Sequence, residues 1–172
     1  MILDKHHNST VSSKKDTCTA MASNVIIDGL DGFRELEGKV LFELDGFTIS
    51  QDEIEEFCRS VKNTEWIHWD LERTKSSKFG GTILPAFFIP AYFSHLFFSI
   101  VEFHNVENML FSGVDKMRLL APIRTGTPIN LVVTVGKIES RDRGIRVLYD
   151  LQWREKDAIS LSGVATFVLR YW

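Results

Sequence analysis

The stretch WIHWD contains the residues of this chain best suited to acid–base chemistry. His68 lies between Trp66 and Trp69, and the acids Glu65 and Asp70 flank them. An imidazole titrates near neutral pH, so it can take a proton from a reacting group and give it back. An acid–base histidine at the mouth of a pocket is one interpretation of this pattern. A partly buried histidine with a structural role only is the more usual one for a single histidine between tryptophans.

The segment that follows His68 is long and uncharged. From Phe79 to Val101 no residue carries a formal charge, a length at which a membrane span must be considered. Its apolar run is interrupted by glycines, prolines and polar residues, which are Gly80, Gly81, Pro85, Pro90, Ser94, His95 and Ser99. We therefore expect no membrane span but a buried central helix, apolar on every side and beginning near Phe87. Pro90 then falls in the first turn, where a missing amide hydrogen costs little.

A helix from about Gln51 to Lys62 is expected to position the histidine. Ser50 followed by Glu53 forms a capping-box pattern, which marks a helix start. Apolar residues then recur at the spacing of one helical face, at Ile54, Phe57, Cys58 and Val61. The end of this helix delivers Asn63 and, a turn later, His68.

Short elements are expected on either side of that helix. Val40–Leu44 and Phe47–Ile49 have the composition of strands, and the Asp45-Gly46 pair between them is typical of a turn. Leu71–Lys75 is predicted to form one further helical turn, with Asp70 placed to cap it.

The last third of the chain has the pattern of an antiparallel sheet. Strands are predicted at Gly113–Leu120, Ile129–Glu139, Ile145–Arg154 and Ile159–Leu169. Every second residue is apolar in the two central ones, at Ile129, Leu131, Val133 and Val135, and at Ile145, Val147, Tyr149, Leu151 and Trp153. Such alternation gives each strand one buried and one wet face. The expected fold class is α+β, with an antiparallel sheet wrapped around the long buried apolar helix.

Composition narrows the class of protein. The 172 residues are 44% hydrophobic and 25% charged, which suits one globular domain. We expect a poorly anchored polar tail at 1–24 and a single domain at 25–172. The net charge of -3 gives no electrostatic reason to expect nucleic acid as a partner. Only Cys18 and Cys58 are present, so neither a disulfide framework nor a metal site is indicated, and a reducing, cytoplasmic setting fits best.

Four blocks of the sequence carry a family resemblance. They are SVKNTEWIHWDLERTKSS, FGGTILPAFF, GVDKMRLLAPIRTGTPINL and ATFVLRYW. In this order they resemble the MaoC-like dehydratases of the hotdog fold, in particular the nodulation protein N-like branch. The resemblance runs from about Ile26 to Trp172, and WIHWD followed by FGGTI is its most specific part.

The resemblance implies a chemistry and a set of site residues. Family members add or remove water at the 2,3 position of an acyl thioester carried by coenzyme A or an acyl carrier protein, so no separate cofactor is expected. They hold the water between an Asp and a His, bind the thioester carbonyl through a backbone amide at the start of the central helix, and support the acid with a Ser. The His matches His68, the amide position matches Ala86, and the Ser matches Ser94. Hotdog chains usually pair, so a homodimer is implied as well.

The Asp position of the family is occupied here by Asn63. A carboxylate can take a proton from water, whereas a carboxamide only orients water through hydrogen bonds. His68 would then act as the base alone, although Glu65 and Asp70 are near in sequence. Pro85 stands where relatives often carry a second histidine.

Several other residues allow two interpretations. Trp66 and Trp69 are expected to complete the core, and Ser94 or Ser99 can bond back to a carbonyl one turn earlier. The phenylalanines of the central helix are core residues or line an acyl tunnel; they are Phe87, Phe88, Phe93, Phe97 and Phe98. Some basic residues could meet the phosphates of a carrier, although solvated surface charges are the simpler interpretation; they are Lys75, Lys78, Lys116, Arg118 and Arg124.

Three hypotheses remain open, and we prefer them in the following order. The first is a hydratase or dehydratase that works through His68, with Asn63 positioning the water. The second is a hotdog enzyme repurposed within a polyketide or fatty-acyl pathway for isomerisation or cyclisation, which tolerates Asn63 because no water is activated. The third is a protein that binds acyl thioesters without turnover.

Overall fold

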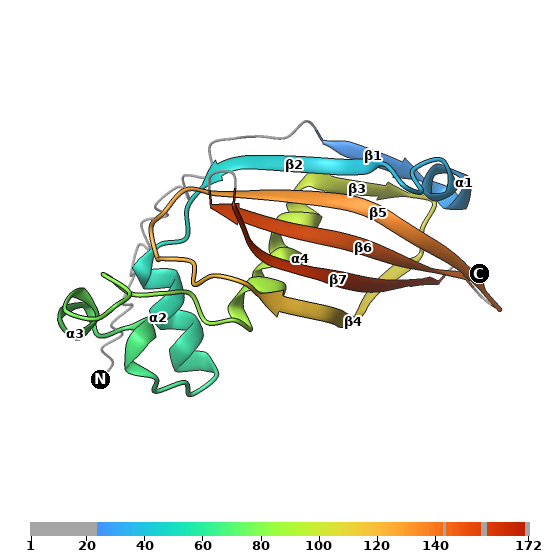
Figure 1. Cartoon of the computed structure of the whole chain (residues 1–172). Helices are drawn as coiled ribbons and strands as arrows, with labels where there is room; N and C mark the ends of the chain where they lie inside the picture. Colours follow the sequence, from blue (N-terminus) through green and yellow to red (C-terminus); the bar gives the residue numbers. More distant parts are fainter. Residues whose placement is uncertain (1–23, 143, 156–157, 171–172) are drawn as a thin grey trace, which may run out of the picture.

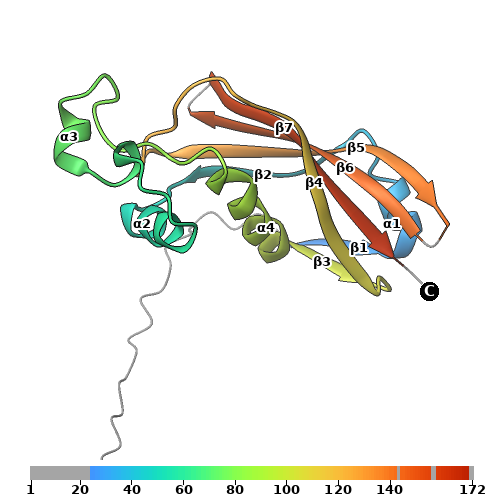
Figure 2. The same ribbon diagram turned by 90° about the horizontal axis from the view of Figure 1, so that it is seen from below.

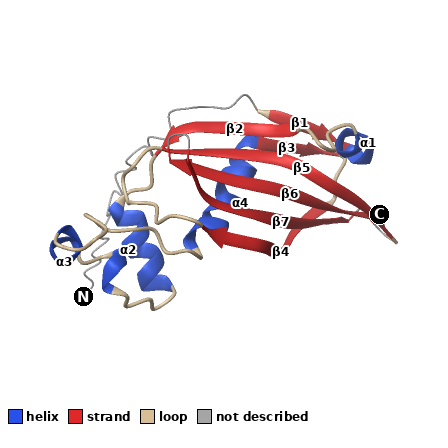
Figure 3. Cartoon of the chain, viewed as in Figure 1, coloured by secondary structure: helices blue, strands red, loops and turns tan. Residues whose placement is uncertain are grey.

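The computed structural model describes residues 24–142, 144–155 and 158–170, the last nine of these by their backbone alone. In chain order the elements are β1 (Val25–Asp28), α1 (Gly29–Arg34), β2 (Val40–Phe47), α2 (Gln51–Ser60), the 3₁₀ turn η1 (Trp66–His68), α3 (Leu71–Lys75), α4 (Phe88–Ile100), β3 (Val101–His104), β4 (Asn108–Leu119), β5 (Ile129–Arg141), β6 (Gly144–Glu155) and β7 (Ala158–Arg170). An antiparallel five-stranded sheet has the order β2-β5-β6-β7-β4. Helix α4 lies along one face of this sheet (Figure 1, Figure 3). The α+β prediction is confirmed.

The alternating pattern of the central strands fixes which face of the sheet meets α4. All the apolar residues predicted to face inward on β5 and β6 are buried, and they join the helix in one core. Phe97 of α4 meets Tyr149 of β6 edge to face, with ring centroids 5.1 Å apart. Each fully buried side chain of this kind contributes about 1.5–3 kcal/mol, so the register of the sheet is strongly specified.

Strand β2 differs from its prediction. It is one strand, Val40–Phe47, and not two strands joined by a turn at Asp45-Gly46. Its pairing with β5 shifts register between Leu44 and Phe47, and Gly46 takes a positive φ of 66° there. The Asp-Gly pair therefore forms a bulge, which lets the strand continue past it.

Helix α4 begins one residue later than predicted, and Pro90 is in its first turn as expected. The helix was predicted to be buried and apolar on every side, and six of its residues are buried, namely Phe88, Ile89, Phe93, Leu96, Phe97 and Ile100; one side of the helix, however, is exposed. Phe87, just before the helix, is 77% exposed and Phe98 is 51% exposed. The sheet covers α4 on one side only (Figure 2). Phe87 and Phe98 are eleven residues apart, which is about three helical turns, so they lie on the same face of the helix. No helix in the described part of the chain is long and apolar enough to cross a membrane.

Two short strands escaped prediction. Val25–Asp28 and Val101–His104 pair in parallel as a separate two-stranded sheet. Val101 follows the last helical residue directly, so the uncharged run contains a helix and the start of a strand. The tail predicted at 1–24 falls almost wholly outside the described residues, and the division at residue 25 stays a prediction.

The elements that position the candidate site lie together beyond one end of the sheet. Helices α2 and α3 form a lobe there, beside the beginning of α4 (Figure 1, Figure 2). Ser50 and Glu53 form the predicted capping box of α2, and the Asp70 side chain caps α3 by accepting from the amide of Arg73. The lobe therefore has well-defined helix starts on both sides of η1.

Candidate active site

The end of α2 places Asn63. The helix stops at Ser60, two residues earlier than expected, because Lys62 takes a left-handed conformation with φ 57°. The amide of Asn63 then donates to the carbonyl of Cys58 at 2.8 Å, and that of Lys62 to the carbonyl of Arg59 at 3.3 Å. These two bonds are a Schellman motif, so the chain leaves the helix in a defined direction.

The carboxamide of Asn63 has its oxygen already engaged. Oδ1 accepts the backbone amide hydrogen of Glu65 at 2.9 Å. Because a backbone N–H only donates, the atom facing it must be the oxygen, which settles the orientation of the amide. The NH₂ group remains available to a ligand, to which it can only donate hydrogen bonds.

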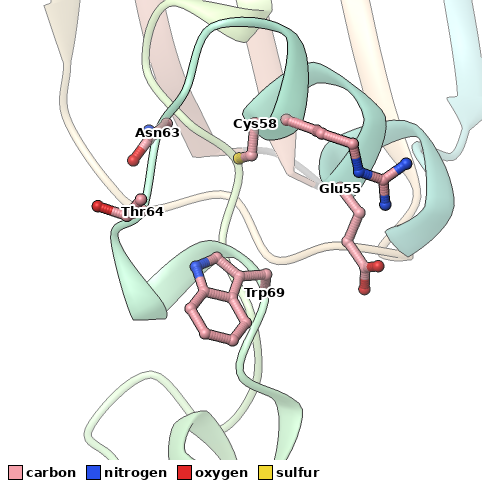
Figure 4. A pocket seen from close by; sticks show the side chains of 6 residues that line it. Glu55, Cys58, Asn63, Thr64 and Trp69 are labelled. Atoms are coloured by element: carbon pink, nitrogen blue, oxygen red, sulfur yellow. The ribbon is translucent and has the colours of Figure 1, made fainter.

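Asn63 lines a cavity of about 350 Å³ between α2 and the turn η1 (Figure 4). The cavity wall is formed by Glu55, Cys58, Arg59, Asn63, Thr64 and Trp69. The pocket wall thus combines the indole of Trp69 with polar and charged residues of α2 and of the segment that follows it. Trp69 is 45% exposed, so its prediction as a core residue is wrong. Of these six, only Asn63 was predicted as a site residue, because the others follow ordinary helix and turn patterns.

His68 is held in one tautomer. It ends η1, is only 7% exposed, and its Nδ1 lies 2.7 Å from the carbonyl oxygen of Ile83. A carbonyl oxygen only accepts, so Nδ1 carries the hydrogen and the neutral ring has its lone pair on Nε2. Nε2 makes no hydrogen bond to any residue that the structure describes. This is the form in which an imidazole can act as a general base.

The same contact brings His68 to the beginning of α4. The amide of Ile83 donates to the carbonyl of Ile67 at 3.1 Å, so two bonds tie the WIHWD turn to the segment leading into the helix. Ala86 follows shortly after and is half-buried, and its amide makes no backbone hydrogen bond to any described residue. The structure thus places His68 and the amide of Ala86 at the same end of α4.

The other predicted residues are less closely joined. No hydrogen bond between described residues links Asn63 to His68, and the cavity beside Asn63 includes neither His68 nor Ala86 in its wall. Ser94 is half-buried on α4, whereas Ser99 bonds back to the carbonyl of Leu96 at 2.8 Å. The catalytic, oxyanion and supporting roles of these residues stay predictions.

The flanking groups have structural partners. Trp66 is half-buried under the guanidinium of Arg73, 3.9 Å from the ring centroid, and Asp70 caps α3 rather than facing His68. Lys75 approaches Glu72 at 3.8 Å, with both side chains exposed. Among the described residues, no His, Cys, Asp and Glu side chains gather into a group that could hold a metal ion.

Cys58 is expected to be a poor nucleophile despite lining the cavity. Burial, and secondarily the charge of Glu55, raise the pKa of its thiol above the ordinary value, and the thiolate is the reactive form. In a Cys18→Ser variant, iodoacetamide should therefore alkylate the folded protein slowly at neutral pH and faster as the pH rises. The rate in denaturant is the control. Equal rates in folded and unfolded protein at neutral pH would contradict the burial of the thiol.

Comparison with known proteins places the chain in a family. A model of the MaoC like domain matches residues 34–153. The 3-hydroxyacyl-thioester dehydratase Z of Mycobacterium tuberculosis is 27% identical over 107 residues, which cover 62% of this chain and 71% of that protein.

Solved structures agree with the fold. The unliganded R-hydratase PhaJ1 from Pseudomonas aeruginosa matches with a TM-score of 0.64 and 14% identity, covering 81% of this chain and 86% of that one. The truncated HadBC (3R-hydroxyacyl-ACP dehydratase) complex from Mycobacterium tuberculosis matches with a TM-score of 0.63 and 17% identity, covering 77% of this chain and 96% of that one. These likenesses confirm the predicted hotdog fold, and the nodulation protein N-like branch stays a prediction. Because the family model spans well over half of the sequence, this chain belongs to the MaoC-like domain family of hydratases and dehydratases.

Proposed function

We propose that the protein adds water to, or removes it from, the 2,3 position of an acyl thioester carried by coenzyme A or an acyl carrier protein. The observation that carries this proposal is the bond from Nδ1 of His68 to the carbonyl of Ile83. It leaves the lone pair of the buried imidazole on Nε2 and holds the ring beside the beginning of α4. Family membership supports the reaction class, and the Mycobacterium tuberculosis relative supports the thioester.

In the hydration direction His68 acts as the base. Nε2 takes a proton from water while the water oxygen bonds to carbon 3 of the enoyl thioester. The electrons of the double bond move towards the thioester carbonyl, whose oxygen accepts a hydrogen bond from the amide of Ala86. The imidazolium then returns its proton to carbon 2. Dehydration runs through the same steps in reverse.

Asn63 orients the water in this scheme. Its NH₂ group donates to the water oxygen, or to the hydroxyl oxygen of the hydrated thioester, and takes no proton. The wild-type rate should therefore be lower than that of a site with a carboxylate at this position. No cofactor is required, because the acyl group arrives on its own phosphopantetheine arm, and we place the reaction in the cytoplasm.

A second candidate function is favoured by the same carboxamide. Its oxygen is engaged by Glu65, so this side chain offers only donors to a ligand. Such a group suits the isomerisation or cyclisation of a carrier-bound polyketide or fatty-acyl chain, in which His68 moves a proton between carbon atoms and no water is activated.

One assay separates these functions. Purified protein is incubated with crotonyl-CoA and longer enoyl-CoA substrates, and products are identified by mass spectrometry. Formation of 3-hydroxyacyl-CoA supports the first candidate, and His68-dependent conversion of another acyl thioester without hydration supports the second. Tight binding of acyl thioesters with no turnover at any chain length would mean that the protein only binds them.

We propose that the chain forms a homodimer through β4. This strand is one edge of the sheet and exposes apolar side chains, namely Leu110, Phe111, Leu119 and the adjacent Leu120. β4 also exposes charged side chains, on Asp115, Lys116 and Arg118, between its two apolar ends, and the opposite edge, β2, exposes those of Glu43 and Asp45. Apolar side chains on an edge strand favour pairing with another chain and charges along an edge oppose it, so we assign the contact to the apolar ends of β4.

Charge placed on the β4 edge should separate the subunits. We expect Leu110→Lys to convert the dimer to a monomer at micromolar concentration, because it puts a cation into a paired apolar edge. Val40→Lys is the matched control, since Val40 is a similarly exposed residue on the opposite edge. Size-exclusion chromatography with light scattering measures both. A monomeric wild-type protein, or a dimer that survives Leu110→Lys, would refute this interface.

A further inference from the structure

Gln51 makes three hydrogen bonds that the sequence did not predict. It is the first residue of α2 and is half-buried. Its Nε2 donates to the backbone carbonyl of His68 at 3.0 Å and to Oε1 of Glu55 at 3.2 Å. Its Oε1 accepts from the hydroxyl of Thr82 at 2.6 Å. Because the His68 carbonyl only accepts, the orientation of the Gln51 amide is fixed by its partners.

These hydrogen bonds form a closed network around the histidine. Gln51 holds the backbone of His68 on one side and the side chain of Thr82 on the other. Thr82 precedes Ile83, whose carbonyl oxygen accepts from the imidazole of His68. One side chain therefore links both ends of the bond that determines the tautomer of the ring.

Gln51 is not needed to begin its helix. The capping box is made by its neighbours, with the Ser50 amide donating to Glu53 at 2.7 Å and the Glu53 amide donating to the Ser50 hydroxyl at 3.3 Å. The Thr82 backbone is also anchored independently, because its carbonyl accepts from the amide of Thr125 at 2.9 Å. Loss of the Gln51 side chain should leave these elements in place and loosen the link between them.

We propose that Gln51 is a positioning residue that keeps His68 in its Nδ1–H tautomer, with the lone pair of Nε2 directed at the substrate. The inference rests on the proposed function of His68 as the base. Without the link, the bond from the Ile83 amide to the Ile67 carbonyl still joins the two segments, but nothing holds the backbone carbonyl of His68 to Thr82, and the alternative tautomer with a protonated Nε2 becomes populated. In that form Nε2 has no lone pair with which to accept a proton from water.

Three variants remove different hydrogen bonds of the network around His68. Gln51→Leu removes all of its hydrogen bonds, and Gln51→Glu keeps the shape and the acceptor for Thr82 but loses the N–H donor. Thr82→Val preserves the shape of the buried side chain while removing its donor hydroxyl. Ser60→Ala is the matched control, since the Ser60 hydroxyl bonds to the carbonyl of Phe57 at the other end of the same helix.

The primary readout is the imidazole tautomer, measured by nitrogen NMR, with the His68 signal assigned by its absence in His68→Ala. We expect wild type and Ser60→Ala to hold the Nδ1–H form and the three variants to show mixed tautomers. Turnover, in wild type or in an Asn63→Asp background, should fall by up to about 100-fold in kcat with a smaller change in KM, as is typical of a misplaced catalytic group.

The outcomes are distinct. If the variants that fold keep the Nδ1–H tautomer and the wild-type kcat, the inference is overturned, and a lowered melting temperature alone would then assign Gln51 a purely structural role. If neither Gln51 variant folds, Thr82→Val, which leaves Gln51 in place, decides. Absence of any turnover in wild type would count against the proposed function only, since the tautomer comparison needs no substrate.

Discussion

Replacing His68 with alanine is expected to lower the rate of enoyl-thioester hydration by about 10²- to 10⁴-fold, which is the usual contribution of a general base. No other described side chain at the beginning of α4 presents a neutral imidazole. The variant should still fold, because the turn that contains His68 is held by backbone bonds, including that of Ile83 to Ile67. Initial rates with crotonyl-CoA, or with the best substrate found in the enoyl-CoA panel, measure the loss.

His95 provides the matched control for this experiment. It lies on α4, is exposed, and its ring packs against Tyr92 at 5.5 Å. His95→Ala should leave the rate within a few-fold of wild type, as expected for a surface residue away from the reacting atoms. Equal rates in His68→Ala and wild type would remove His68 from the mechanism.

Changing Asn63 to aspartate should have the opposite effect. The engaged oxygen of Asn63 can keep its bond to the amide of Glu65 as a carboxylate oxygen, and the second oxygen then replaces the NH₂ group. The site gains a group that takes a proton from water, so hydration should accelerate by about 10²-fold or more. Steady-state rates of the purified variant measure the gain.

Thr64→Asp distinguishes a positioned base from added charge. Thr64 lines the same cavity and is exposed, so this variant puts a carboxylate next to the site at the wrong position. We expect it to leave the rate near that of wild type. A similar gain in both variants, or none in Asn63→Asp, would show that position 63 has lost the geometry of a water-binding site.

The sheet could be predicted from sequence because its pattern is local. In β5 and β6 alternate residues such as Val133 and Val147 are buried, and this periodicity is visible in the printed letters. The capping box at Ser50 and the cap at Asp70 were predictable for the same reason. Each depends on residues no more than a few positions apart.

What could not be predicted depends on contacts between distant segments. The uncharged sequence of α4 does not reveal that the sheet covers only one of its sides, so the exposure of Phe87 and Phe98 was missed. The parallel pairing of Val25 with Val101 joins segments far apart in the chain. The bulge at Gly46 was mistaken for a turn, because an Asp-Gly pair serves both.

The candidate site could be predicted from the sequence only in part. The tautomer of His68 depends on Ile83, and its support depends on Gln51 and Thr82, and no local pattern connects these residues. Asn63 was recognised because the resemblance to the family marks its position. The orientation of its carboxamide could not be predicted, because it depends on a hydrogen bond from the amide of Glu65 that only the structure reveals.

The most direct test of this account uses water labelled with a heavy oxygen isotope. Wild-type protein is incubated with enoyl-CoA substrates in labelled water, and the 3-hydroxyacyl product is examined by mass spectrometry alongside His68→Ala. The account predicts enzyme-dependent incorporation of the heavy oxygen at carbon 3, lost in His68→Ala and increased in Asn63→Asp. A folded wild-type protein and a folded Asn63→Asp variant that both leave every enoyl thioester unlabelled would contradict it.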